Sequence, residues 1–257
     1  MERSTTTKGA ALITGGSRGI GAQTALALAK RGYDVAITYR NKAARANELL
    51  EAVKQLDVRG LTVGCDITHP EDLDRLFATL TAWHNSLNLL ILNASGGMER
   101  DLVAADPQYP IHINRDAQLA LVDRALPLMP QGSTVVFVTS HWAHLYGQIE
   151  QIPAYEPVAE SKHAGEQALR KRQQELEEKG IRLLIVTGDL IEGTITPKLL
   201  ERTAPGLIAE TRDSMGKLPT AAEVGELIAT SATNINLLNG TTIVIGRSLD
   251  TLLPASE

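Results

Sequence analysis

Seven short apolar runs that alternate with longer helical patterns constrain the fold of this chain more than any other feature. Most runs are apolar throughout, which is typical of parallel strands covered on both faces. The runs lie at residues 9–14, 34–39, 60–65, 87–93, 133–139, 181–187 and 241–246, and the helical patterns between them at residues 20–31, 43–56, 71–83, 115–129 and 158–179. This alternation predicts an α/β fold, with a doubly wound parallel sheet of about seven strands, helices on both faces and ligands at the carboxyl ends of the strands.

Length and composition fit one such domain. The chain has 257 residues and no Gly/Pro/Ser linker, so residues 1–257 are predicted to form a single domain. The net charge of -5 and the lack of a basic run longer than residues 170–172 argue against a nucleic-acid partner. A single cysteine, Cys65, leaves no disulfide framework, and no His/Cys/Asp constellation predicts a metal site. With no N-terminal apolar signal and no run of about 20 apolar residues, we expect a cytoplasmic protein with no membrane partner.

The stretch TGGSRGIG, residues 14–21, joins the first predicted strand to the first predicted helix. Its glycines at positions 15, 19 and 21 permit a tight turn, a close approach of the backbone to a pyrophosphate, and close packing of the helix. The free N–H groups and the positive dipole end of that helix would face the phosphates. Glycines with this spacing between a strand and a helix therefore predict a dinucleotide site.

The same octet resembles the signature of the short-chain dehydrogenase/reductase family, whose members have a Rossmann-type fold. The resemblance continues in order along the chain, through CDIT at residues 65–68, NASGG at residues 93–97, the helix around Asn114, and the last helix and strand at residues 216–246. The ending differs, because IGR at residues 245–247 replaces the family's Asp-Gly-Gly. The resemblance implies a homodimer or homotetramer. The positions predicted to contact the cofactor are Gly15, Ser17, Arg18, Gly19, Ile20, Gly21, Tyr39, Arg40, Asn41, Asp66, Ile67, Asn93, Ala94, Ser95, Tyr155, Lys162, Gly188 and Thr194.

The choice of cofactor is predicted from the charges at the end of the second strand. A carboxylate there would bind the 2′-hydroxyl of an adenosine ribose and repel a 2′-phosphate. The sequence has Tyr39, Arg40 and Asn41 instead, with no acidic residue. Arg40 and Arg18 can both offer charge-assisted hydrogen bonds to a 2′-phosphate. We therefore expect NADPH/NADP.

Four polar residues are predicted to carry out a carbonyl reduction. The resembled family has a serine after the fifth strand and a tyrosine four residues before a lysine, and Ser140 and Lys162 match. Val158 is four residues before Lys162, whereas Tyr155 is seven before it. Positions seven apart differ by about 20° around a helix and by about 10 Å along it, so both side chains share one face. Tyr155 is thus predicted to donate the proton, and Lys162 to lower its pKa. The resemblance assigns Ser140 to orienting the carbonyl and Asn114 to supporting a water relay.

Three functions are compatible with these residues. The first is NADPH-dependent reduction of a small-molecule ketone, aldehyde or 3-oxoacyl carbonyl. The second is reduction of a C=C bond, because the seven-residue spacing is similar to that of enoyl-acyl-carrier-protein reductases. The third is an inactive NADP-binding protein, in which Val158 marks a lost tyrosine. Tyr146, six residues after Ser140, is a rival proton donor.

The neighbourhood of Ser140 and Tyr155 carries two further expectations. Proline suits the first turn of a helix, so Pro157 predicts a helix that begins near residue 156. The stretch SHWAH at residues 140–144 either lines the substrate pocket or packs structurally.

The segment after the sixth strand also carries expectations. Gly188 and Thr194 match the family's glycine and its carboxamide-binding threonine, although Thr187 replaces a proline. Asp189 and Glu192 either face solvent or disfavour anionic substrates. Residues 195–215 are expected to form a helical lid over the pocket.

Overall fold

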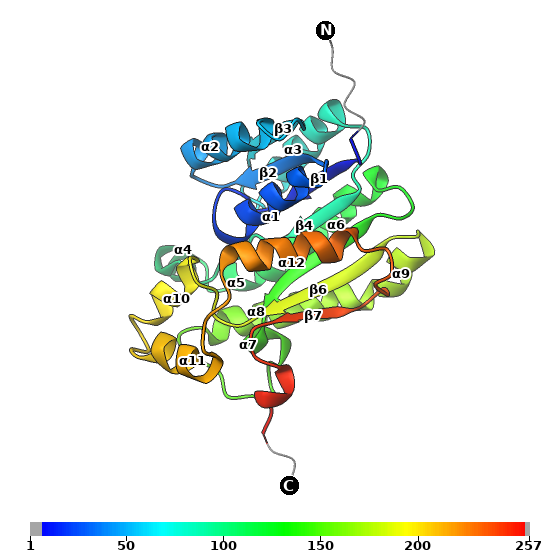
Figure 1. Cartoon of the computed structure of the whole chain (residues 1–257). Coiled ribbons are helices and arrows are strands. Elements are labelled where there is room, and N and C mark those ends of the chain that lie inside the picture. Colours follow the sequence, from blue (N-terminus) through cyan, green and yellow to red (C-terminus); the bar gives the residue numbers. More distant parts are fainter. Residues whose placement is uncertain (1–6, 255–257) are drawn as a thin grey trace.

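One parallel sheet of seven strands forms the centre of the molecule (Figure 1). The structure, a computed structural model, describes residues 7–254, except for the side chains of residues 214 and 215. The strand order is β3-β2-β1-β4-β5-β6-β7. The strands are β1 Ala10–Ile13, β2 Asp34–Tyr39, β3 Gly60–Gly64, β4 Leu89–Leu92, β5 Thr134–Ser140, β6 Arg182–Gly188 and β7 Thr242–Ile245. The predicted doubly wound parallel α/β sheet is confirmed, with all seven strands at the apolar runs.

Helices cover both faces of the sheet because successive strand residues point into two separate apolar cores. Leu12 of β1 belongs to the core shared with α3, α6 and α8, and its neighbour Ile13 to the core shared with α1, α2 and α12. The helical elements in chain order are α1 Gly19–Lys30, α2 Ala43–Lys54, α3 Pro70–Trp83, α4 Arg100–Ala105, α5 Tyr109–Ile111, the π-helical turn η1 His112–Asp116, α6 Ala117–Ala125, the 3-10 turn η2 Leu126–Leu128, α7 His141–His144, α8 Glu156–Lys171, α9 Gln173–Glu178, α10 Ile195–Leu200, α11 Leu207–Met215, α12 Ala221–Thr233 and the 3-10 turn η3 Leu249–Thr251.

The strand order sets the position of the candidate site. β1 pairs with β2 on one side and with β4 on the other. From β1, strands β2 and β3 therefore extend the sheet toward one edge, and strands β4 to β7 extend it toward the other. In open α/β sheets, ligands bind outside the carboxyl ends of the strands at such a switch point. The glycine loop lies there, directly after β1.

Several helices differ from the expected ranges. The helix expected over residues 115–129 starts with the π-helical turn η1, and the one expected over residues 158–179 is divided at Arg172 into α8 and α9. Helix α8 begins at Glu156 with Pro157 in its first turn, as predicted. Of the residues 195–215, residues 195–200 and 207–215 are helical, as α10 and α11, and residues 201–206 form turns between them. No helix within residues 7–254 has the length and apolar character needed to cross a membrane.

An ion pair between Asp34 and Arg59 lies at the amino-terminal edge of the sheet. Asp34 at the start of β2 has a fully buried side chain and accepts hydrogen bonds from the backbone N and the Nε of Arg59, at 2.8 and 2.7 Å. The guanidinium of Arg59 also lies 5.3 Å from the centre of the Trp83 ring, a cation–π distance. This pair lies at the edge opposite the glycine loop.

Candidate active site

The start of the glycine loop is tied to β2. Gly15 N donates to Thr38 Oγ1 at 3.1 Å and Gly16 N to Thr38 O at 2.9 Å, which anchors the loop on β2. Gly15 and Gly19 have positive φ angles of 64° and 54°, which favour glycine. Helix α1 follows with no side-chain cap at Arg18, so its first N–H groups lack a partner from the cap side chain.

Asn93 and Ala94 brace this loop from β4. Asn93 Nδ2 donates to Thr14 O at 2.9 Å, and the N–H groups of Asn93 and Ala94 both donate to Thr14 Oγ1 at 3.0 Å. A Cβ added at Gly15 would come 3.0 Å from Ala94 Cα, and one added at Gly21 would come 2.6 Å from Asn93 Nδ2. Gly15 and Gly21 are therefore required for the packing of the loop against Ala94 and Asn93. The loop leads into the uncapped start of α1, whose N–H groups fit the pyrophosphate of a dinucleotide.

A cavity of about 1020 Å³ lies beside the carboxyl ends of β2 and β3, and its lining includes Arg40, Asn41, Asp66 and Glu99. The Asp66 carboxylate accepts hydrogen bonds from the N–H and hydroxyl of Thr68, at 3.1 and 2.7 Å, which fixes the turn after β3. Ile67 in this turn is buried. Of the residues predicted to meet the adenosine half of the cofactor, Arg40, Asn41 and Asp66 thus line one cavity, whereas Tyr39 and Ile67 are not part of its lining.

Arg40 has partners of its own in this cavity. Its Nη1 donates to the Tyr109 hydroxyl at 2.6 Å, and its Nη2 lies 3.4 Å from Glu99 Oε1. Burial and the nearby Glu99 carboxylate raise the pKa of Tyr109 to about 12, so its phenol is neutral near pH 7. Arg18 is exposed at the start of α1. A 2′-phosphate at this position would share Arg40 with these two side chains.

Ser140 and Tyr155 meet at the carboxyl end of β5. Ser140 ends the strand and caps the short helix α7, accepting a hydrogen bond from Ala143 N at 3.3 Å. Tyr155 precedes the first residue of α8, and its hydroxyl donates to Ser140 Oγ at 3.1 Å. The Trp142 ring packs edge-on against the Tyr155 ring, with 6.2 Å between centroids. The position of Tyr155 at the start of α8 therefore brings a phenol to the serine.

Val158, the residue four before the lysine, is buried in the same apolar cluster as Tyr155 and Trp142. The cluster also contains Leu190, Leu200 and Leu218, of which Leu200 belongs to the predicted lid. Its members are otherwise Ala143 and Ala159, with Met98, Tyr146, Ile149, Ile152, Leu207 and Ile208 partly buried against it. The surroundings of the phenol are apolar.

Burial shifts the pKa of both titratable groups of the predicted pair. Burial raises the pKa of Tyr155, and the hydrogen bond with Ser140 partly opposes that shift. Burial lowers the pKa of Lys162 to about 8. The group that lowers the Tyr155 pKa in this structure is Ser140, whereas the sequence predicted Lys162 for this role.

Asn114 lies in the π-helical turn η1, against α8. Its Nδ2 donates to Gly96 O and to Ser161 Oγ, both at 2.9 Å. A Cβ at Gly165 would lie 2.1 Å from the Asn114 carbonyl oxygen, so only glycine permits this approach. Asn114 is therefore fixed against the turn of α8 that contains Ser161 and Lys162. It belongs to a π-helical turn, and such turns are frequent at functional sites.

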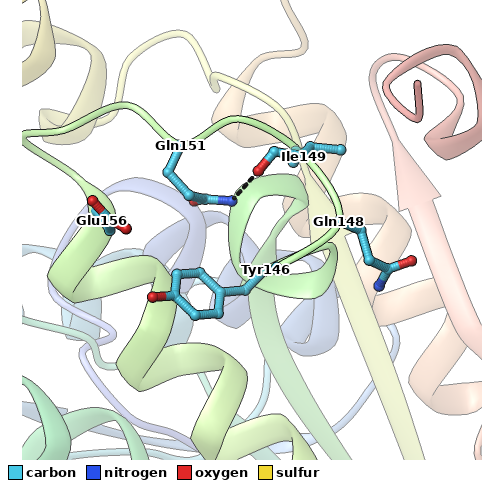
Figure 2. A pocket seen from close by; sticks show the side chains of 6 residues that line it. Tyr146, Gln148, Ile149, Gln151 and Glu156 are labelled. Carbon is cyan, nitrogen blue, oxygen red and sulfur yellow. Dashed lines mark hydrogen bonds between the residues drawn. The ribbon is translucent and has the colours of Figure 1, made fainter.

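Tyr146, the rival donor, is partly buried against the apolar cluster that contains Tyr155. It lines a surface cavity of about 480 Å³ with Gln148, Ile149, Gln151 and Glu156 (Figure 2). Its ring lies 5.8 Å from that of His163 on α8. The hydrogen bond to Ser140 comes from Tyr155, which makes Tyr155 the better-placed phenol.

The two histidines of SHWAH pack structurally. His141 is fully buried, with Nδ1 3.0 Å from Thr187 Oγ1, and burial lowers its pKa to about 4. His144 Nδ1 lies 2.8 Å from Glu166 Oε1, a buried carboxylate that also accepts from Arg170 Nε at 2.9 Å. Burial alone would raise the pKa of Glu166, but His144 and Arg170 hold it below its usual range. No group of three or more His, Cys, Asp or Glu side chains in the described part of the chain could hold a metal ion.

The two acidic residues of the turn after β6, Asp189 and Glu192, lie in different surroundings. Asp189 is buried and pairs with Arg247, whereas Glu192 is exposed and lies 3.3 Å from Arg212 of α11. Thr194 donates to Ile191 O at 2.7 Å, and its methyl group would lie 3.7 Å from a Cβ placed on Gly19. Thr194 is thus next to the glycine loop. The partnership of Asp189 with Arg247 was not predicted, although both positions depart from the family pattern.

Known proteins resemble this chain over most of its length. A family model described as short chain dehydrogenase matches residues 9–203. The chain is 29% identical over 187 residues to 1-cyclohexenylcarbonyl-CoA reductase of Streptomyces collinus, covering 70% of this chain and 64% of that protein, less than two thirds of its length. It is 27% identical over 220 residues to hydroxynaphthalene reductase arp2 of Aspergillus fumigatus, covering 84% and 77%. A short-chain dehydrogenase from Burkholderia cenocepacia, solved in complex with NADP, superposes with a TM-score of 0.81 at 25% identity, covering 96% and 100%.

Proposed function

The chain belongs to the short-chain dehydrogenase family, and we propose that it is an NADPH-dependent reductase of an uncharged, apolar ketone or aldehyde. Oxidoreductase chemistry with a nicotinamide cofactor follows from the family, and the two named relatives are reductases. The observation that carries the proposal is the 3.1 Å hydrogen bond from Tyr155 to Ser140 at the carboxyl end of β5. A carbonyl oxygen beside this pair would have one proton donor and one further hydrogen-bonding hydroxyl.

Each residue has a distinct role in the proposed reaction. The glycine loop and Arg40 would hold NADPH, which would supply the hydride for the carbonyl carbon. Tyr155 gives its proton to the carbonyl oxygen, and its raised pKa keeps the phenol protonated until that moment. Ser140 orients the same oxygen. Lys162, as an ammonium ion, would stabilise the phenolate that forms and hold the cofactor ribose, while Asn114 positions α8 and supports the water that returns the proton.

The preference for NADPH rests on the charges around the adenosine cavity. Arg40 lines that cavity, and no acidic residue follows β2 within residues 39–41. A guanidinium there favours a 2′-phosphate through charge-assisted hydrogen bonds. The similar Burkholderia structure contains NADP, in agreement with this preference.

Purified protein with NADPH or NADH and a panel of ketones, aldehydes and enoyl thioesters tests the proposal. We expect turnover of apolar ketones or aldehydes, with a higher kcat/KM for NADPH than for NADH. Cofactor binding without turnover of any carbonyl would contradict the proposal and support an inactive cofactor-binding protein.

Reduction of a C=C bond is the second candidate. The Streptomyces relative is named for an unsaturated acyl-CoA, and Tyr155 precedes Lys162 by seven residues, as in enoyl reductases. In that reaction, Tyr155 would protonate an enolate instead of an alkoxide. Turnover of enoyl thioesters without turnover of ketones would favour this candidate over the first.

A further inference from the structure

We propose that Asp189 and Arg247 are positioning residues, which hold the turn of residues 190–194 in the place where it meets the cofactor and the substrate. The two residues replace the family's usual pattern after β6 and after β7. They form a two-pronged ion pair, in which Arg247 Nε donates to Asp189 Oδ2 at 2.5 Å and Nη2 to Oδ1 at 3.1 Å. The proposal builds on the proposed function, because that function requires a nicotinamide beside this turn.

The Asp189–Arg247 pair lies at the same edge of the sheet as Ser140. Ser140 of β5 is in register with Gly188 of β6, and Gly188 with Ile245 of β7. Asp189 is thus one residue, and Arg247 two residues, beyond the row that contains Ser140. Asp189 N also donates to Ile245 O at 3.2 Å, so the pair links the ends of β6 and β7 through backbone and side chains.

The carboxylate of Asp189 acts on the backbone of the turn. Its Oδ1 accepts a hydrogen bond from Leu190 N at 2.8 Å. Leu190 is buried in the apolar cluster that contains Tyr155. At the other end of the turn, Thr194 lies beside Gly19 of the glycine loop. One ion pair therefore sets the start of a segment whose first residue packs in the cluster of the proton donor and whose last residue approaches the cofactor loop.

The ion pair between Asp189 and Arg247 depends on its geometry because the Asp189 carboxylate is buried. The Asp189 side chain is 0% exposed and that of Arg247 is 25% exposed, so the carboxylate depends on its protein donors. The adjacent His141 has a pKa lowered to about 4, mainly by burial, so near pH 7 it is neutral and does not compete for the carboxylate. Loss of one charge from a buried pair leaves the other uncompensated, and the segment attached to it shifts.

Asp189→Asn and Arg247→Lys test the proposal, with cofactor binding as the main measurement. We expect Asp189→Asn to raise the Kd of NADPH, measured by nicotinamide fluorescence, about tenfold, because a binding segment is misplaced without being removed. We expect an intermediate rise for Arg247→Lys, which keeps the charge but not the two-pronged geometry. If Asp189→Asn does not fold, Arg247→Lys carries the test with the same measurements.

Asp34→Asn is the matched control. Asp34 is also 0% exposed and also pairs with an arginine, but at the opposite edge of the sheet. Both aspartate variants should lower the Tm, and Asp189→Asn alone should raise the Kd. A Kd within about twofold of wild type in Asp189→Asn and Arg247→Lys would overturn the proposal. The binding assay needs no substrate and is run with NADH as well, so failure of the carbonyl or NADPH assignment would be recognised separately.

Discussion

At the scale of single residues, the site depends on which phenol reaches Ser140. Two tyrosines lie near this serine in the sequence, but the hydrogen bond comes from Tyr155. Tyr146 lies at the surface cavity of Figure 2. This difference can be tested with two substitutions of the same kind.

Tyr155→Phe removes the proposed proton donor and little else. We expect kcat for carbonyl reduction to fall by about 10² to 10⁴, the usual contribution of a positioned acid. The loss of absorbance of reduced nicotinamide measures this rate. Tyr146→Phe is the matched control and should keep the wild-type rate. Equal rates for Tyr155→Phe and the wild-type protein would remove Tyr155 from the mechanism.

The pH dependence should report Lys162. Its pKa is lowered to about 8, so its ammonium ion is lost as the pH rises through that value. We expect kcat/KM, which reflects the free enzyme, to fall above about pH 8, because the phenolate then lacks its cation. In Lys162→Arg the guanidinium stays protonated, so this alkaline decline should disappear even if the rate is lower. A decline at the same pH in both proteins would assign it to another group.

Stability should change with pH in the opposite direction. The folded chain holds the Lys162 proton less tightly than the unfolded chain, whose pKa is near the ordinary 10.5. Burial of the charged amine therefore costs stability below about pH 8, and this cost disappears as the pH rises toward 10.5. Lys162→Met, which has no titrating amine, should lack this rise in a series of Tm measurements.

At the scale of elements, α8 carries the site because of how it starts and what it packs against. The sequence predicted its start correctly, since Pro157 suits a first helical turn. The π-helical turn η1 was not predicted, because no local residue pattern marks an extra residue within a helix. Its partner in α8, Gly165, looks like an ordinary helical glycine until the Asn114 carbonyl is seen against it.

Gly165→Ala should disturb the contact between α8 and η1. The new Cβ would stand 2.1 Å from the Asn114 carbonyl oxygen, so one of the two elements must move. Overpacking of this kind costs about 1–3 kcal/mol, which lowers the Tm of a chain this long by roughly 2–4 °C per kcal/mol. We also expect a lower kcat, because Lys162 belongs to the same helix. Ala164→Ser, an addition of one atom at a partly exposed position next to it, should leave Tm and kcat nearly unchanged.

At the scale of the whole molecule, the apolar runs and their order along the chain predicted most of the fold. They predicted every strand, because a strand buried on both faces must be apolar throughout. The glycine loop was placed for a related reason, since it must follow β1 at the switch point of the sheet. The buried ion pair of Asp189 and Arg247 could not be predicted, because its members are far apart in the sequence and meet only when β6 and β7 pair.

The two cores on either side of the sheet should contribute to stability independently. Leu76 of α3 and Leu28 of α1 are both fully buried, but in different cores. Each substitution to alanine should cost about 2–5 kcal/mol in the free energy of unfolding. The double variant should equal the sum within about 0.5 kcal/mol, because the residues share no partner. Unfolding by denaturant measures all three values, and a larger deviation would show that the sheet couples its two faces.

Because η1 is a π-helical turn, the number of residues in it is as restricted as their types. Residues 112–116 contain one residue more per turn than an α-helix would, and each residue turns a helix by about 100°. Deleting a single residue between Asn114 and α6 would restore a regular helix and, with α6 in place, rotate Asn114 by about 100° away from Gly96 and Ser161. Active descendants of this chain should therefore accept many substitutions around Asn114, but few insertions or deletions.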